Sequence, residues 1–193
     1  MLHCSEPNLP KNNRYHPTTD EVAAWLTRLE GGPLPALMGA AAGLRRQGHG
    51  DVISFSPKVF IPLTQLCRDA CGYCIFAKPP RLLERPYLRP EDVLKIANDG
   101  ALNGCSEALF TLGDRPEKRY RVASSALAEL GHTTTIGYLA QMAARGHKDT
   151  GWRAHSNAGV MSREEIAALR RVSVSQGIML ESNSDRLARK GGA

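Results

Sequence analysis

The N-terminal quarter of the chain has a polar start followed by two stretches with helical periodicity. Residues 1–17 are polar and contain several prolines, which is typical of a loose arm. A Thr-x-x-Glu capping box at residues 18–21 precedes apolar positions that share one helical face, namely Val22, Leu26 and Leu29. After a Gly-Gly pair, an alanine-rich segment predicts a second helix over residues 34–46. We therefore expect residues 1–48 to form a polar arm and a short helical extension.

From residue 51 onward, short β-branched and aromatic runs alternate with helical periodicity. The runs predict strands over residues 51–55, 58–63, 107–112, 153–156 and 177–181. Proline near a first helical position, capping residues and helical spacing predict a helix that opens at residues 89–92 and further helices over residues 120–130, 135–145 and 162–171.

This alternation indicates parallel strands joined by right-handed crossovers. Four βα units make up half of an eight-unit barrel, whose usual length is about 250 residues. The sequence therefore predicts an α/β fold, the first half of a TIM-like barrel. About four βα units would occupy residues 49–193, with the C-terminal half of the barrel absent.

Charge and hydropathy narrow the classes of partner. The chain has 25 Lys and Arg against 19 Asp and Glu, a formal net charge of +6, and the basic residues are scattered along it. A nucleic-acid partner would need this charge on one face or stripe. No apolar run approaches the roughly 18 residues of a membrane span, and residues 1–14 lack the apolar core of a signal peptide. We expect a cytoplasmic protein with neither a nucleic-acid nor a membrane partner.

Three of the five cysteines lie within eight residues, in the loop after the predicted strand at residues 58–63. Cys67, Cys71 and Cys74 form a C-x3-C-x2-C pattern. Three thiolates on one short loop can each bind a different iron of a [4Fe–4S] cluster, which leaves the fourth iron without a protein ligand. That iron can chelate the amino and carboxylate groups of S-adenosylmethionine, whose reductive cleavage yields a radical.

Two other interpretations of the cysteines stay open. A structural zinc site needs four ligands, so Cys4, Cys105 or a distant histidine would have to complete it. Alternatively, Cys71 and Cys74 could form a thiol–disulfide redox pair, which leaves Cys67 without a role. The spacing favours the iron–sulfur cluster over both.

The residues around the cysteines carry a family resemblance. A C-x3-C-x-aromatic-C loop after the first strand of a barrel is similar to the signature of the radical S-adenosylmethionine superfamily. The fuller run over residues 58–77 resembles the deazaflavin-forming, ring-closing half of the FO synthase family. Further blocks at residues 107–117, 155–161 and 177–182 resemble the same family. The resemblance spans residues 34–187 and covers the first half of a radical S-adenosylmethionine barrel.

The resemblance implies a role for each residue of the cysteine loop. Cys67, Cys71 and Cys74 would hold the [4Fe–4S] cluster. Tyr73 would lie against the adenine of S-adenosylmethionine, and the backbone of Phe76 would lie at the adenine edge. Without the resemblance, both aromatic residues would be assigned to packing.

The ends of three later strands supply the other cofactor contacts that the resemblance implies. Gly113 and Asp114 would receive the ammonium group of S-adenosylmethionine, Asn157 would approach its methionine or ribose, and Glu181 would bind its ribose hydroxyls. From the residues alone, Asp114 could instead cap a helix and Glu181 could pair with Arg186.

The resemblance also implies the reaction of a radical S-adenosylmethionine lyase. The whole enzyme would form 7,8-didemethyl-8-hydroxy-5-deazariboflavin from the tyrosine-derived hydroxybenzyl adduct of ribitylaminouracil, with loss of ammonia. The implied partners are this small-molecule adduct, an electron donor such as a flavodoxin or ferredoxin, and the sister tyrosine-coupling enzyme or domain.

Two departures from the family pattern bear on activity. Residues 146–154 are charged where the family has an apolar helix end and strand, so we expect a poorly formed third strand. Strands five to eight are missing, so the chain is expected to be an N-terminal fragment. The alternatives are a non-catalytic, truncated cluster-binding paralogue or partner-binding module, and a thiol–disulfide redox protein that uses Cys71 and Cys74.

Overall fold

The computed structural model describes residues 18–20, 24, 34–179 and 184–189. It divides the chain into two compact units, Met1–Phe55 and Ser56–Ala193. In the first unit, α2 (Leu34–His49) confirms the predicted alanine-rich helix and extends it to His49. The predicted helical face with Val22, Leu26 and Leu29 lies outside the described residues.

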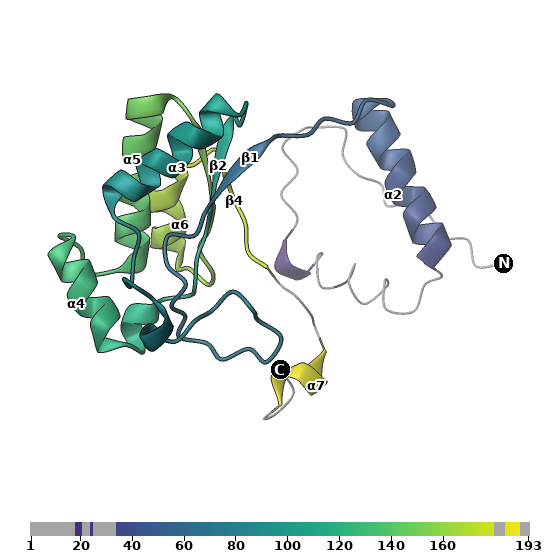
Figure 1. The fold of residues 1–193 in the computed structure, drawn as a ribbon. Coiled ribbons are helices and arrows are strands. Elements are labelled where there is room, and N and C mark those ends of the chain that lie inside the picture. The colour runs from purple at the N-terminus through teal and green to yellow at the C-terminus, as the bar shows by residue number, and fades with distance from the viewer. Residues whose placement is uncertain (1–17, 21–23, 25–33, 180–183, 190–193) are drawn as a thin grey trace. The chain divides into compact units, whose positions relative to one another are not determined.

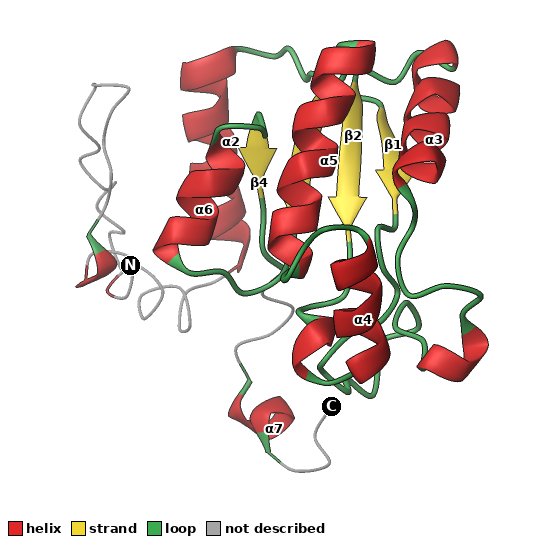
Figure 2. Ribbon diagram, turned by 90° about the vertical axis from the view of Figure 1, so that its left-hand side faces the viewer, coloured by secondary structure: helices red, strands yellow, loops and turns green. Residues whose placement is uncertain are grey.

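The second unit is built on a four-stranded parallel sheet, as the alternation of strand and helix patterns predicts. Its strands are β1 (Lys58–Ile61), β2 (Glu107–Thr111), β3 (Arg153–Asn157) and β4 (Ser175–Gln176), in the order β1-β2-β3-β4. All three pairings are parallel, and the arrows labelled in Figure 2 run in one direction. The carboxyl ends of the strands therefore meet at one edge of the sheet.

Helices connect these strands and lie on one face of the sheet. α3 (Pro90–Leu102) follows β1, α4 (Arg121–Glu129) and α5 (Thr135–Thr150) follow β2, and α6 (Arg163–Arg170) follows β3. Figures 1 and 2 show α3, α5 and α6 against the same face. The remaining described elements are short: η1 (Pro80–Leu82), η2 (Pro116–Lys118) and α7 (Asp185–Ala188). Among the described helices, none is long and apolar enough to span a bilayer.

Two of these helices begin where the sequence signals predict. Pro90 occupies the first turn of α3, where its missing N–H costs no hydrogen bond, and Asp92 accepts from the Arg89 backbone N–H at 3.1 Å. In α6, Ser162 Oγ accepts from the Glu165 backbone N–H at 3.3 Å, and Glu165 Oε2 accepts from the Ser162 N–H at 2.7 Å. This reciprocal capping box confirms the predicted start of α6.

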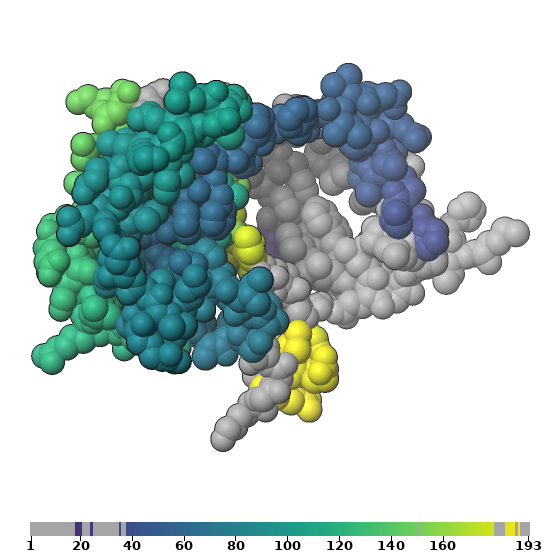
Figure 3. All heavy atoms as spheres, in the orientation of Figure 1, coloured from purple at the N-terminus to yellow at the C-terminus, as the bar shows by residue number. Residues whose placement is uncertain are grey.

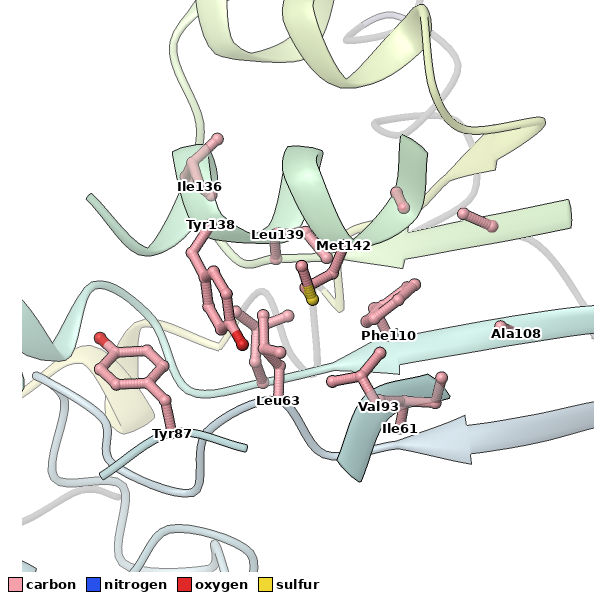
Figure 4. Packing of buried hydrophobic residues seen from close by; sticks show 14 of the residues in the cluster. Ile61, Leu63, Tyr87, Val93, Ala108, Phe110, Ile136, Tyr138, Leu139 and Met142 are labelled. Atoms are coloured by element: carbon pink, nitrogen blue, oxygen red, sulfur yellow. The ribbon is translucent and has the colours of Figure 1, made fainter. Parts of the chain in front are cut away.

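The core lies between the sheet and the helices that cover it. Ile61 of β1 and Phe110 of β2 are fully buried, and Figure 4 shows them pointing toward Val93 of α3 and Met142 of α5. Burial of such side chains stabilises the fold by about 1.5–3 kcal/mol each. A well-packed core therefore holds the sheet whose strand ends carry the candidate site.

The opposite face of the sheet is only partly buried. Phe60, Leu109 and His155 lie side by side in the register of β1, β2 and β3, and Phe60 is 47% exposed. Leu109 and His155 are half-buried, whereas the alternate residues Ala108 and Phe110 are buried. This period of two follows from the pleat of a strand, which points successive side chains to opposite faces.

Two strand predictions were wrong in whole or in part. Residues 51–55 form no strand, and Val52, Ile53 and Phe55 are 78–89% exposed, because a β-branched run without a neighbouring strand gains no sheet hydrogen bonds. Of the predicted last strand, residues 177–179 form no strand and residues 180–181 lie outside the described residues, whereas β4 precedes them. Ser156 pairs with Gln176 and β3 ends one residue later, so pairing stops there.

The expectation of a poorly formed third strand was also wrong. α5 continues to Thr150, Gly151 ends it with φ 75°, and all five residues of β3 pair with β2. Arg153 is exposed and lies opposite Glu107 in the register, so the strand buries no unpaired charge. A Cβ at Gly146 would lie 1.7 Å from the Trp152 ring, so the absence of a side chain at Gly146 lets α5 approach the start of β3.

Candidate functional site

The cysteine loop, residues 64–79, leaves the carboxyl end of β1. Figure 1 shows it extending away from the end of the sheet, and in Figure 3 the segment that follows β1 lies at the surface of the second unit. Two contacts close its base: the Lys78 N–H donates to the Gln65 carbonyl at 2.9 Å, and Gln65 Nε2 donates to the Phe76 carbonyl at 3.3 Å. The loop therefore lies at the edge of a parallel sheet where βα folds carry out their chemistry.

The three cysteines of this loop are free thiols in different environments. Cys67 and Cys74 are half-buried, whereas Cys71 is exposed. Cys67 Sγ accepts two backbone hydrogen bonds, from the Asp69 N–H at 3.4 Å and from the Asp114 N–H at 3.3 Å. Two backbone N–H groups are thus directed at the sulfur of Cys67.

The surroundings of Cys71 raise the pKa of its thiol on balance. Partial burial raises the pKa of the Cys71 thiol, and the negative charges of Asp69, Cys67 and Cys74 raise it further. Reactive C-x2-C cysteines have lowered pKa values and lie next to helix N-termini or cations. A bound metal would instead stabilise all three thiolates and reverse the repulsion among them.

The three thiols of the loop are possible donors for an iron–sulfur cluster or for a single metal ion. Within the described part of the chain, no three His, Cys, Asp or Glu side chains form a group that could hold a metal ion. A cluster, however, takes each thiolate at a separate iron. Cys105 precedes β2, whereas the cysteine loop follows β1, whose Ile61 lies beside Phe110. At about 3.3 Å per strand residue, Cys105 lies near the opposite edge of the sheet and cannot be a fourth ligand. Cys4 lies outside the described residues.

The two aromatic candidates of the loop have different surroundings. Tyr73 is 57% exposed beside Cys74. Phe76 packs edge-on against Phe60 of β1, with ring centroids 6.2 Å apart. Phe60 belongs to the partly buried face of the sheet, so Phe76 turns the end of the loop back toward that face.

Gly113 and Asp114 follow β2 and lie directly against the cysteine loop. The Gly113 N–H donates to the Thr64 carbonyl at 3.2 Å, and a Cβ at Gly113 would lie 1.9 Å from the Leu66 carbonyl oxygen. Only glycine allows the two backbones to come this close. Asp114 is 8% exposed, and its Oδ1 lies 3.1 Å from Arg68 Nε.

Of the candidate residues at and after the end of β3, the structure describes Asn157 but not Glu181. Asn157 is the last residue of β3 and lies beside Thr111 in the register, at the same edge as Gly113. Gly159 follows with φ 74°, and a Cβ there would lie 2.7 Å from Asp114 Oδ2. Cys67, Gly113 and Asp114 are thus in direct contact, with Asn157 on the neighbouring strand. Glu181 lies outside the described residues.

The cysteine loop meets the end of β2 where Thr64–Arg68 contacts Gly113 and Asp114, and this contact is the junction. Sequence reasoning missed three arginines around it. Arg68 pairs with Asp114, and Arg119 Nη1 donates to the Arg68 carbonyl at 2.9 Å. Arg115 is the only described non-glycine residue with a positive φ, 36°, and donates to Glu165 at 2.9 and 2.5 Å. The position of Arg68 between two cysteines was a usable signal. No local pattern marks the other two, because their partners are about 50 residues away in sequence.

Two polar residues of the partly buried face are engaged elsewhere. Glu107, at the start of β2, accepts from Ser56 Oγ at 2.6 Å and from Lys58 Nζ, and these contacts lower its pKa, with Lys58 contributing most. Glu107 therefore lies at the opposite end of β2 from Asp114. His155 Nδ1 is hydrogen-bonded to Ser175 Oγ at 2.6 Å, which fixes its ring beside β4.

Comparison with known proteins gives relatives over most of the chain. No family model matches it. The FO synthase of Mycobacterium tuberculosis is 44% identical over 182 residues, which cover 87% of this chain and 21% of that protein. The 7,8-didemethyl-8-hydroxy-5-deazariboflavin synthase of Methanopyrus kandleri is 43% identical over 141 residues, which cover 73% of this chain and 42% of that protein.

A solved structure shares the fold. Methylornithine synthase (PylB) aligns with a TM-score of 0.54 at 15% identity, covering 92% of this chain and 48% of that one. The four βα units thus match about half of that structure, and the chain spans between a fifth and two fifths of the length of the two relatives. The chain therefore belongs to the FO synthase family of radical S-adenosylmethionine enzymes.

Proposed function

We propose that this chain forms the cluster-binding part of a radical S-adenosylmethionine enzyme of deazaflavin synthesis. The observation that carries the proposal is the triplet Cys67, Cys71 and Cys74 at the carboxyl end of β1, with two backbone N–H groups already directed at Cys67 Sγ. When bound, a [4Fe–4S] cluster would supply the electron that cleaves S-adenosylmethionine to a radical. Each thiolate of the triplet would hold one iron.

Residues next to the cysteines would bind S-adenosylmethionine. Tyr73 offers an exposed ring beside Cys74, and Phe76 offers backbone groups at a position fixed by Phe60. Gly113 and Asp114, just beyond the end of β2, would receive the ammonium group, and Asn157, at the end of β3, would approach the methionine or ribose. We keep Glu181 as a proposed ribose contact on the resemblance alone.

The whole reaction is proposed from the relatives. It would convert the hydroxybenzyl adduct of ribitylaminouracil to 7,8-didemethyl-8-hydroxy-5-deazariboflavin with loss of ammonia. The M. kandleri relative bears the name of this product, and its 43% identity to this chain over 141 residues supports a shared chemistry. An external electron donor such as a flavodoxin or ferredoxin would be required, together with the sister tyrosine-coupling enzyme. We propose a cytoplasmic site of action, because unpaired thiols persist in a reducing compartment.

The metal assignment is tested by anaerobic reconstitution of the full 193-residue chain. We expect about four irons and four sulfides per chain. Cys67→Ala, Cys71→Ala and Cys74→Ala should each abolish uptake, and the matched control Cys105→Ala should retain it. S-adenosylmethionine should change the electron paramagnetic resonance spectrum of the reduced protein. Zinc in place of iron, or dependence on Cys105, would contradict the proposal.

A further inference from the structure

The Cys67 end of the cysteine loop is joined to the end of β2 through the backbone. The Arg68 N–H donates to the Asp114 carbonyl at 2.8 Å, and the Asp114 N–H donates to Cys67 Sγ at 3.3 Å. One residue before Asp114, the Gly113 N–H donates to the carbonyl of Thr64, four residues before Arg68, at 3.2 Å. These contacts fix the first half of the loop against β2.

The Asp114 carboxylate is engaged by groups of the chain itself. Oδ2 accepts from the Val160 N–H at 3.1 Å, in the loop between β3 and α6. Oδ1 lies 3.1 Å from Arg68 Nε, and both atoms are buried and form no hydrogen bond within the described residues, so the contact between them is an ion pair alone. Two longer ion pairs flank this contact: Asp114 Oδ1 lies 3.8 Å from Arg115 Nε, and Arg68 Nε lies 3.8 Å from Asp69 Oδ1. Loss of either partner would therefore remove the shortest ion pair at this place. Asp114 therefore ties the cysteine loop to two strand ends at once.

A second arginine holds the same stretch of loop from outside. Arg119 Nη1 donates to the carbonyls of Arg68 at 2.9 Å and of Asp69 at 3.2 Å. These carbonyls directly follow Cys67, so Arg119 and Asp114 restrain the backbone on both sides of the Arg68 side chain.

The outer half of the loop has fewer such ties. The Cys74 N–H donates to the Cys71 carbonyl at 3.1 Å, a contact within the loop, and Ile75 is 97% exposed. Cys71 is exposed, unlike Cys67. The three cysteines therefore differ in how firmly the fold positions them.

We propose that Asp114 is a positioning residue which, through Arg68 and with Arg119, holds Cys67 in place before a cluster binds. Cys71 and Cys74 would then be drawn in by the cluster itself. The proposal rests on the proposed function, in that a cluster is what the loop holds. It is separate from the proposed contact between Asp114 and the ammonium group of S-adenosylmethionine, and its test needs no cofactor.

The test is hydrogen exchange on the iron-free, full-length chain, where no cofactor can contribute. We expect Asp114→Asn and Arg68→Ala each to raise exchange at the Arg68 and Asp114 amides about tenfold, since each removes a hydrogen bond or ion pair that closes the junction. The double variant should match the single variants within about twofold, because both act on one contact. The control Asp99→Asn, which breaks the exposed Lys95–Asp99 pair on α3, should leave these amides unchanged.

Three further measurements test the positioning role of Asp114. Amides of α5, such as that of Leu139, should keep their protection, and Arg68→Lys should keep part of the protection at the junction. Unchanged exchange at the Arg68 amide in Arg68→Ala and Asp114→Asn, or equal loss over α5, would overturn the positioning role. Iron uptake is measured separately, so absence of iron in the unmodified chain rejects the cluster proposal without altering the exchange result.

Discussion

At the scale of single residues, the site depends on a few positions whose importance is set by distant neighbours. The cysteine triplet could be predicted because its chemistry is local, with three thiols in eight residues. Asp114 could be predicted as a site residue but not as the partner of Arg68 and Val160, which lie 46 residues away on either side. A sequence pattern gives residue types and spacings, whereas such contacts depend on which strand ends the fold brings together.

Gly113 gives the sharpest prediction at this scale. A Cβ there would lie 1.9 Å from the Leu66 carbonyl and 2.9 Å from the Cys67 Cα, both backbone atoms that cannot rotate away. Gly113→Ala should therefore lower the free energy of unfolding by about 1–3 kcal/mol, and it should reduce iron uptake because Cys67 moves. Urea unfolding and iron analysis check both effects. Gly177→Ala is the matched control, since its Cβ would meet only the His155 ring at 3.4 Å. Equal stability of the two variants would mean that the junction yields without cost.

At the scale of elements, long periodic segments were predictable and short paired ones were not. α2, α3, α5 and α6 were predicted because capping boxes, proline and helical spacing lie within each segment. β4 is two residues long and is defined by the end of β3, which no local signal marks. The run at residues 51–55 has strand composition but lacks a neighbour. Strand identity is a property of pairs, so sequence reasoning fails first at sheet edges.

The ion pair between Arg115, which follows β2, and Glu165 of α6 leads to a prediction about pH. Hydrogen bonds from Arg115 hold the pKa of Glu165 below its usual value of 4.5. A carboxylate with a lowered pKa in the folded state adds stability above its unfolded pKa, and this stability is lost as the pH falls through the folded value. Glu165→Gln keeps the capping box with Ser162 but loses the ion pair. The variant should be less stable near neutral pH by about 1 kcal/mol, with the difference vanishing in acid. Urea unfolding across this pH range measures the difference in the free energy of unfolding. A difference that does not change with pH would mean that the substitution acts on the capping box and not on the ion pair.

At the scale of the whole molecule, the described sheet matches half of a known fold. The four strands run parallel in sequence order, and helices cover one face, as the first half of a βα barrel requires. The opposite face carries Phe60, Leu109 and His155 in one row, and in a closed barrel this face would point inward. The order and direction of the strands were predicted from the alternation of patterns. The mixture of apolar and polar side chains on this face was not predicted, because alternate positions can be assigned to a face only once the register is known.

The partial match to longer proteins leads to a prediction about which chain is active. The chain matches 42% of the M. kandleri relative and 48% of methylornithine synthase, so a barrel of that kind needs strands beyond the four described here to enclose a substrate. We expect a fusion of this chain to the part of the M. kandleri relative that it does not match to form fluorescent deazaflavin from the hydroxybenzyl adduct, given S-adenosylmethionine and a reductant. The 193-residue chain without the added part should form little or none, although it should still take up iron. The same fusion with Cys71→Ala is the matched control and should be inactive, because the cluster would lose one of its three ligands. If the fusion cleaves S-adenosylmethionine but makes no deazaflavin, the radical chemistry stands and the proposed substrate is wrong. If the chain without the added part makes deazaflavin at the rate of the fusion, the four βα units suffice and the inner face of the open sheet is itself the substrate site.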